Sequence, residues 1–154
     1  MKIECLFVGK TSDRYLDEGI SDFNKRLARY CKVSVKIVRE IKSKASDAEI
    51  TRSEGQGILK AVSEEAYWVV LDPKGMSLSS EEFAQQISQW QIQNRKTIAF
   101  IVGGSNGVSS EVLQRADFRL SLSKMTFTHD MSRLILFEQL YRAYSILAGS
   151  KYHK

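Results

Sequence analysis

Two short runs of almost wholly apolar residues constrain the fold of this chain more than any other feature. The first, YWVVL, covers Tyr67–Leu71, and the second, IAFIV, covers Ile98–Val102. Continuous apolar runs of this length are typical of strands that are buried on both faces, as in a parallel sheet covered by helices. We therefore expect an α/β protein whose sheet carries helices on both faces.

Strand and helix patterns alternate along the rest of the chain. We predict strands over residues 2–8, 33–38, 67–71, 98–102 and 118–122, and helices over about 14–30, 47–64, 80–95, 110–115 and 132–148. Ser46 and Ser79 each precede a glutamate by three positions, which is the capping-box spacing that opens a helix. The alternation predicts a mostly parallel sheet of about five strands. One proline occurs and no linker or repeat is evident, so we expect residues 1–154 to form a single domain.

The composition is that of a soluble globular protein. Of 154 residues, 43% are apolar and 27% are charged, which excludes disordered and fibrous chains. No apolar run approaches the roughly 20 residues of a membrane span, and the first residues lack a cleavable signal pattern, so we expect a cytoplasmic protein with no membrane partner. Cys5 and Cys31 are expected to be buried, reduced thiols. Together with only two histidines they form no zinc-ligand pattern, and we expect no metal.

The positive charge of the chain is concentrated in one segment. The net charge is +5, and residues 24–44 hold eight lysines and arginines against one acid, Glu40. A concentrated basic segment on a nearly neutral body points to a polyanionic partner, most often a nucleic acid. A solvated basic face would have the same composition, so charge alone leaves both interpretations open.

Three segments follow predicted strands at the edge where open parallel sheets bind ligands. They are Leu71–Gly75, Gly103–Gly107 and Ser121–His129, and they converge on one pocket if their strands are neighbours. The glycine segment matches neither the dinucleotide nor the P-loop fingerprint. Glycines in this position permit positive φ and close approach of the backbone to a ligand, although a tight strand-to-helix turn would also explain them.

Several motifs in a fixed order resemble one known family over essentially the whole chain. They are LDPxG at residues 71–75, IVGGSNG at 101–107, LSLSKMTFxH at 120–129, RLxLxEQLYRAYSI at 133–146 and a terminal YHK. No single motif suffices, but in combination they are highly specific. The chain resembles the large-subunit ribosomal RNA methyltransferase H family, the pseudouridine N3-methyltransferases of the SPOUT class.

The resemblance implies a fold, a cofactor and a partner. It implies an α/β fold with a C-terminal trefoil knot whose loops hold S-adenosylmethionine, and a homodimer. The methyl acceptor is then N3 of a pseudouridine in a stem-loop of 23S rRNA, presented by the assembled 70S ribosome or the large subunit. Family positions for the methyl donor carry over to Leu71, Gly103, Gly104, Ser123, Lys124, Met125, Thr126, Phe127 and Thr128. Thr128 stands where the family pattern often has proline or asparagine.

Two histidines are candidates for a general base. The N3–H of pseudouridine is neutral at pH 7, so its proton must leave before or during methyl transfer, and histidine has a suitable pKa. His129 lies in the expected donor segment beside Asp130, where it serves either as a base or in a loop-shaping hydrogen bond. The resemblance assigns Tyr152 and His153 to substrate binding or catalysis, although chain ends often fray. The sequence leaves the base open.

Basic residues outside and inside the charged segment are candidates for RNA contacts. We predict phosphate contacts for Lys25, Arg26, Arg29, Arg142 and Lys154. Arg133 is a further candidate on the last helix. Glu138 and Arg142, four positions apart, also fit an ion pair within that helix. The tyrosines of this helix, Tyr141 and Tyr144, fit the core or a dimer interface better than a platform for base stacking.

Two other functions remain compatible with the same fold. A non-catalytic RNA- or ribosome-binding protein would bind RNA in a salt-sensitive manner without affinity for the methyl donor. A small nucleotide-binding regulator would bind its ligand at the strand ends with no dependence on RNA.

Overall fold

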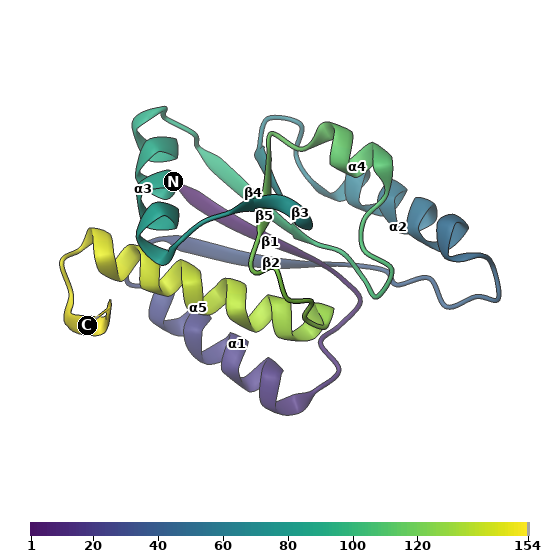
Figure 1. The fold of residues 1–154 in the computed structure, drawn as a ribbon, viewed down its shortest axis with the longest axis horizontal. Coiled ribbons are helices and arrows are strands. Elements are labelled where there is room, and N and C mark those ends of the chain that lie inside the picture. Colours follow the sequence, from purple (N-terminus) through teal and green to yellow (C-terminus); the bar gives the residue numbers. More distant parts are fainter. Residues whose placement is uncertain (154) are drawn as a thin grey trace.

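Strands and helices alternate along the chain in the computed structural model, which describes the backbone of residues 1–153 and the side chains of residues 1–152. The strands and α-helices, labelled in Figure 1, are β1 (Lys2–Val8), α1 (Arg14–Leu27), β2 (Lys32–Val38), α2 (Asp47–Ala61), β3 (Tyr67–Ser77), α3 (Ser80–Ile92), β4 (Thr97–Val102), α4 (Ser110–Arg115), β5 (Phe118–Ser121) and α5 (His129–Leu147). A short 3-10 helix, η1 (Lys151–His153), follows α5. Each predicted strand and helix is therefore confirmed; β1 and α4 have the predicted bounds, and the ends of the others are shifted.

The strands form one sheet in the order β2-β1-β4-β3-β5. All of its strand pairs in the described chain are parallel; in the centre, Ile3 of β1 lies between Val33 of β2 and Ile98 of β4. The predicted parallel sheet of about five strands is thus confirmed. In a parallel sheet the carboxyl ends of all strands lie at one edge, which here carries Gly103–Gly107 after β4, Ser121–His129 at the end of β5, and Leu71–Gly75 within β3.

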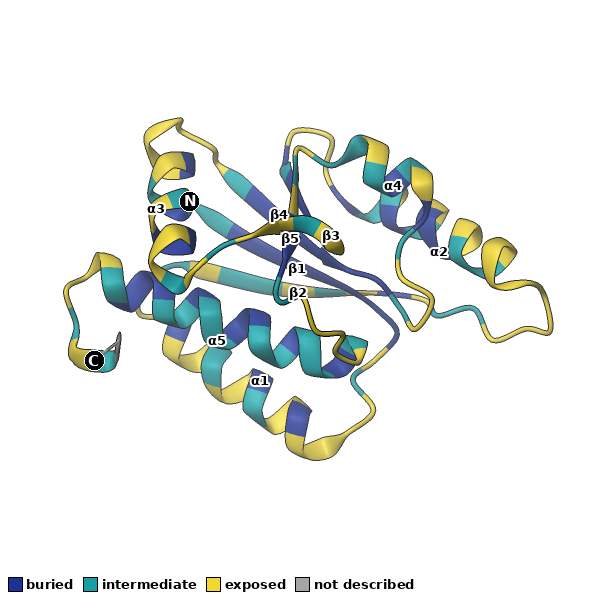
Figure 2. Cartoon of the chain, in the orientation of Figure 1, coloured by how far each residue is buried: buried dark blue, intermediate teal, exposed yellow. Residues whose placement is uncertain are grey.

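Helices cover both faces of the sheet, as the apolar runs predict. Helices α1, α3 and α5 lie on one face, and α2 and α4 lie on the other (Figure 1). Figure 2 shows β1 and β4 almost wholly in the colour of buried residues. Alternate β1 side chains enter two separate cores: Phe7 packs with the α5 layer, and Leu6 with the α2 layer. Burial on both faces is why these strands lack a polar alternation.

Two element boundaries differ from prediction for local reasons. Strand β3 does not end at Leu71 but continues to Ser77 beside β5, with a register shift between Leu71 and Met76. Glycine is required in this bulge, because a Cβ at Gly75 would lie 2.6 Å from the backbone of Arg119. Helix α5 begins at His129, three residues earlier than predicted, because the Thr128 hydroxyl caps it by accepting the Met131 amide at 3.2 Å.

The two cysteines differ in burial. Both are free, but only Cys5 is buried; Cys31 is partly exposed, so its predicted burial was wrong. Both capping boxes, at Ser46 and Ser79, are confirmed. Within the described residues, no helix has the length and apolar character needed to cross a membrane. The trefoil knot and the single-domain assignment stay predictions.

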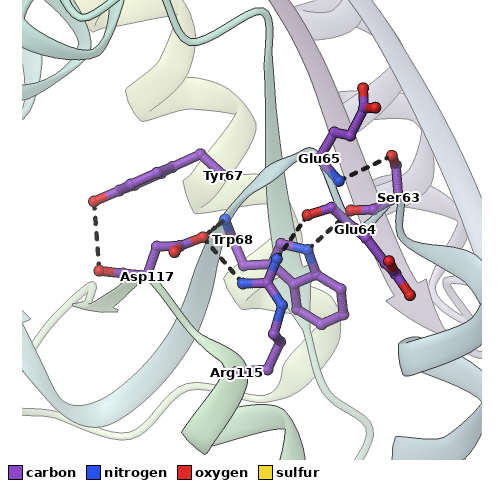
Figure 3. A network of polar contacts seen from close by, with 7 residues as sticks. All are labelled: Ser63, Glu64, Glu65, Tyr67, Trp68, Arg115 and Asp117. Carbon is purple, nitrogen blue, oxygen red and sulfur yellow. Dashed lines mark hydrogen bonds and ion pairs between the residues drawn. The ribbon is translucent and has the colours of Figure 1, made fainter.

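A polar network fixes β5 beside β3 at the edge opposite the three segments (Figure 3). Asp117 Oδ2 accepts the Trp68 amide at 2.7 Å, and Arg115 Nη1 lies 3.3 Å from the same oxygen. Arg115 also donates to the Glu64 carbonyl at 2.9 Å and lies over the Trp68 ring. The network thereby connects the start of β3 to the turn between α4 and β5.

Replacing the carboxylate of this network should destabilise the protein without affecting the ligand edge. We expect Asp117→Asn to lower the free energy of unfolding by about 1–2 kcal/mol, because the Trp68 amide and Arg115 lose a charged acceptor. Urea denaturation measures the change. An unchanged midpoint would show that the network contributes nothing to stability.

A second charge cluster makes stability depend on pH. The largely buried Glu4 carboxylate lies 2.5 Å from Lys2 Nζ and 3.0 Å from Lys36 Nζ. Burial alone would raise the pKa of Glu4, but the hydrogen bonds and charges of the two lysines lower it overall. A lowered pKa in the folded state stabilises the protein above the ordinary pKa of glutamate, and this contribution is lost as the pH falls.

Glu4→Gln should therefore flatten the acid limb of the stability profile. We expect the loss of unfolding free energy between about pH 5 and pH 3 to be smaller in this variant than in the wild type. Urea denaturation at each pH provides the comparison. Parallel profiles for the two proteins would contradict the assignment.

Candidate active site

A cavity of about 500 Å³ lies at the carboxyl ends of β4 and β5 and beside residues 71–73 of β3, next to the start of α5. This volume is within the range of small-molecule and cofactor sites. All three segments singled out from the sequence contribute to it, so their predicted convergence is confirmed. Its lining consists of Leu71, Asp72, Pro73, Val102, Gly103, Gly104, Ser105, Gly107, Leu120, Ser121, Leu122, Ser123, Met125, Thr126, Phe127, Thr128, His129 and Ser132.

The glycine segment forms a tight turn that only glycine fits at two positions. The Gly107 amide donates to the Gly104 carbonyl at 3.0 Å, and Gly107 has a φ of +79°. A Cβ at Gly103 would lie 2.3 Å from the Gly107 carbonyl oxygen. At Gly104 the nearest atoms to a Cβ would be Glu54 Oε2 at 3.2 Å and Val8 Cγ1 at 3.3 Å. The glycines thus both make the turn and bring bare backbone to the cavity wall.

The segment after β5 is shaped by its own hydroxyl groups. Ser121 Oγ donates to the Ser123 carbonyl at 3.0 Å, and Ser123 Oγ accepts the Met125 amide at 2.9 Å. The family pattern often has proline at the position of Thr128, the cap of α5. Thr128 has a φ of −61°, which proline also adopts, so the local backbone accommodates either residue. Met125 and Phe127 line the cavity yet are 75% and 37% exposed, so they form an apolar rim at its mouth.

Most of the predicted donor positions meet at this cavity. Eight of the nine lie in its lining, and Lys124 does not. Asp72 lies in the first of the three predicted segments although it is not among the donor positions, whereas Ser132 lies outside all three segments and was not predicted. Ser132 follows His129 by three positions, so helical spacing would have found it had the helix start been placed correctly.

Asp72 places a carboxylate at the cavity wall. Arg119 Nε donates to Asp72 Oδ2 at 2.7 Å, and the Lys74 amide donates to Oδ1 at 3.1 Å. Burial alone would raise the pKa of Asp72, but these partners lower it overall. The wall therefore combines apolar side chains, backbone groups and one carboxylate that is already paired.

His129 lines the cavity, and Arg133 behind it is not a surface residue. His129 Nε2 lies 3.3 Å from Asp130 Oδ1. Arg133 is 0% exposed and pairs with Asp130 at 2.9 Å, so its candidacy for an RNA phosphate contact was wrong. Burial lowers the pKa of Arg133, while the charges of Asp130 and Glu40 oppose this. Arg133 belongs to the buried side of α5, with Leu136 and Leu140.

The C-terminal segment packs at the far end of α5. Tyr152 is folded back rather than frayed: its hydroxyl donates to Glu138 Oε1 at 3.2 Å, and its ring lies 4.7 Å from that of Tyr141. Tyr152 does not line the cavity. The 13 residues from His129 to Arg142, which stacks on Tyr152, correspond to about 20 Å of helix. The His153 side chain and Lys154 lie outside the described residues.

The predicted ion pair on α5 is confirmed. Arg142 Nη2 donates to Glu138 Oε1 at 2.6 Å, and this contact raises the pKa of Arg142. Tyr144 is buried and Tyr141 partly so, as expected for core residues. Burial, and then the Glu138 charge, raise the pKa of Tyr152. RNA contact by Arg142 stays a prediction.

The basic segment divides into two groups at opposite edges of the sheet. Lys25, Arg26 and Arg29 are exposed before the start of β2, whereas the exposed Lys42 and Lys44 follow its end. Seven residues of strand, about 23 Å, separate the groups. Arg26 pairs with Asp22 at 2.8 Å and lies near the Tyr141 ring, so the first group adjoins the C-terminal segment. Lys32 and Lys36 lie on β2 between these groups, and exposed Arg39 directly follows it, so RNA binding by the whole basic segment stays a prediction.

No set of three or more histidines, cysteines or acids in the described part of the chain is placed to hold a metal ion. The cavity suits a small organic ligand: the backbone groups of Gly103 and Gly104 offer fixed donors and acceptors, and Leu71 and Met125 offer apolar contacts.

Comparisons with known proteins agree with this geometry. A solved structure of a probable methylase family protein from Haemophilus influenzae Rd KW20 has a similar fold, with a TM-score of 0.52 at 13% identity, covering 96% of this chain and 66% of that one. A family model described as "Predicted SPOUT methyltransferase" matches residues 1–153. Proteins named "Ribosomal RNA large subunit methyltransferase H" from Desulfotalea psychrophila and Carboxydothermus hydrogenoformans are 46% and 44% identical over 100% of both chains. The chain therefore belongs to the SPOUT methyltransferases and, within that class, to the ribosomal RNA large subunit methyltransferase H family.

Proposed function

We propose that this protein transfers a methyl group from S-adenosylmethionine to N3 of a pseudouridine in a stem-loop of 23S rRNA. The observation that carries the proposal is the cavity at the strand ends, which eight of the nine expected donor positions line. The names of the full-length relatives support rRNA as the substrate. The enzyme acts in the cytoplasm on the large subunit or the assembled 70S ribosome and needs no metal.

The residues of the cavity bind and align the donor. Bound S-adenosylmethionine supplies a methyl group that is activated by attachment to a positively charged sulfur. The glycine turn holds the adenosine portion against rigid backbone, so little conformational freedom remains to be lost on binding. Leu71, Met125 and Phe127 exclude water from the reacting groups. Correct alignment of donor and acceptor contributes up to about 7–11 kcal/mol toward lowering the barrier.

A general base at the cavity removes the N3 proton. His129 is the candidate that lines the cavity. A positioned base accelerates such a step by about 10²–10⁴-fold. Tyr152 and His153 serve the acceptor nucleotide, and Arg142 and Lys154 hold its phosphates.

A homodimer reconciles these roles with the distances within one chain. The C-terminal segment of a protomer lies about 20 Å along α5 from its own cavity, so it cannot serve that cavity as it is packed here. In a symmetric dimer the same segment of the partner subunit reaches the apolar rim formed by Met125 and Phe127. In each protomer the basic group of Lys25, Arg26 and Arg29 adjoins the C-terminal segment. The basic group of the partner subunit therefore approaches the same site as the partner's C-terminal segment, and it binds RNA phosphate there.

A methyl-transfer assay tests the proposal. Purified protein is incubated with donor carrying a labelled methyl group and with 70S ribosomes, large subunits, small subunits or protein-free 23S rRNA. We expect label in 23S rRNA from ribosomes or large subunits, and mass spectrometry should identify N3-methylpseudouridine. Salt-sensitive RNA binding without any transfer would favour a non-catalytic binding protein, and label in another nucleoside would contradict the assigned acceptor.

A further inference from the structure

Arg133, the most buried charged residue in the described part of the chain, lies directly behind the cavity wall. It is 0% exposed. Its Nη2 donates to the Val8 carbonyl at 2.6 Å and its Nη1 to Thr11 Oγ1 at 3.1 Å, while the guanidinium lies 4.8 Å from the centre of the Phe7 ring. The end of β1 and the turn after it thus fix Arg133 on three sides.

Asp130 connects this buried cation to the cavity. The residue is 5% exposed, and its Oδ2 accepts the Ser12 amide at 2.8 Å. Its Oδ1 lies 2.9 Å from Arg133 Nη1 and 3.3 Å from His129 Nε2. Oδ1 is buried and receives no hydrogen bond of good geometry, so it keeps acceptor capacity on the side of the imidazole. The hydrogen bond from Ser12 and the charge of Arg133 thus keep the carboxylate beside His129.

We propose that Asp130, fixed by Arg133 and the Ser12 amide, is the positioning residue of His129. It holds the imidazole with Nε2–H toward the carboxylate and leaves Nδ1 as the acceptor for the proton of the substrate. A carboxylate that accepts a hydrogen bond from one imidazole N–H fixes the tautomer, and so determines which ring nitrogen carries the free lone pair.

The chemical meaning of this arrangement rests on the proposed function. During transfer the N3–H electron pair stays on nitrogen and forms the bond to the methyl carbon, while the carbon–sulfur pair leaves with the sulfur. The proton goes to His129 Nδ1. The resulting imidazolium then faces Asp130, whose negative charge stabilises it, and Arg133 keeps that carboxylate in place.

Nitrogen-15 spectroscopy of labelled histidine tests the positioning independently of activity. The His129 signals are identified by their loss in His129→Gln. We expect the wild type to show the Nε2–H form, and Asp130→Asn to show a mixture of both neutral forms. Asp117→Asn is the matched control, because it removes a carboxylate from a hydrogen-bond network at the other edge of the sheet, and it should leave the His129 signals unchanged. Unchanged signals in a folded Asp130→Asn protein would overturn the proposal.

Kinetics provides the second readout. We expect Asp130→Asn to lower kcat about 10- to 100-fold with little change in donor affinity, and to cause little further loss in a His129→Gln background. If the losses in kcat of the two single variants add in full in the double variant, the proposal that Asp130 acts through His129 is overturned.

A double variant keeps the test valid where loss of one partner of a buried pair prevents folding. Asp130→Leu/Arg133→Met removes both charges and should give the same mixed imidazole signals, whereas wild-type signals would overturn the proposal. Absence of methyl transfer by the wild type would refute the proposed function alone, because the spectra would still decide the positioning.

Discussion

Gly103→Ala is expected to abolish binding of the methyl donor. The added Cβ would lie 2.3 Å from the Gly107 carbonyl oxygen, so the turn must open and the backbone that lines the cavity must move. We expect a loss of affinity of about 100-fold or more, equivalent to about 2.7 kcal/mol. Calorimetric titration of the folded variant with S-adenosylmethionine measures it.

The neighbouring glycine provides the control. At Gly104 a Cβ would meet its nearest atoms at 3.2 and 3.3 Å, so shifts of a few tenths of an ångström suffice. Gly104→Ala should therefore lose less than about tenfold in affinity. Equal losses in the two variants, or wild-type affinity in folded Gly103→Ala, would contradict the assignment of the glycine turn to the donor site.

Removal of residues 152–154 is expected to abolish methyl transfer while donor affinity is kept. Tyr152 contacts Glu138, Tyr141 and Arg142 at the far end of α5 and does not line the cavity. The truncated protein should bind S-adenosylmethionine as the wild type does, because its cavity is intact. Turnover on ribosomes, measured beside calorimetry, separates the two effects. Normal turnover would show that the C-terminal segment does not serve the site.

Mixing two inactive variants tests whether that segment acts on the partner subunit. A Gly103→Ala protomer keeps its C-terminal segment, and a truncated protomer keeps its cavity. After subunit exchange, mixed dimers should recover up to about a quarter of wild-type turnover, because half the dimers are mixed and each has one complete site. Absence of recovery, with mixed dimers verified by mass spectrometry, would mean that the segment serves its own cavity.

Patterns within single segments predicted most of the fold. The runs at Tyr67–Leu71 and Ile98–Val102 indicate buried strands because both of their faces need apolar side chains. The capping boxes at Ser46 and Ser79 fix two helix starts. The continuation of β3 past Leu71 was not predictable, because it depends on the backbone of β5, to which Gly75 is close.

The candidate site was predictable where it follows chain order and not where it depends on packing. Glycines and hydroxyl residues after three strands indicated the cavity. Arg133 resembles an ordinary surface arginine in the sequence, and only contacts with Val8 and Thr11, more than 120 positions away, make it a buried residue. Tyr152 was assigned to the site by resemblance, whereas within one protomer α5 separates the two by about 20 Å.

The most direct test of the account is calorimetric titration of the wild-type protein with S-adenosylmethionine and with its demethylated product, S-adenosylhomocysteine. We predict one site per chain with a dissociation constant between about 1 and several tens of micromolar, or about −8 kcal/mol at the tight end. Absence of binding heat at several temperatures, from folded protein, would contradict the claim that the cavity at the strand ends is the methyl-donor site.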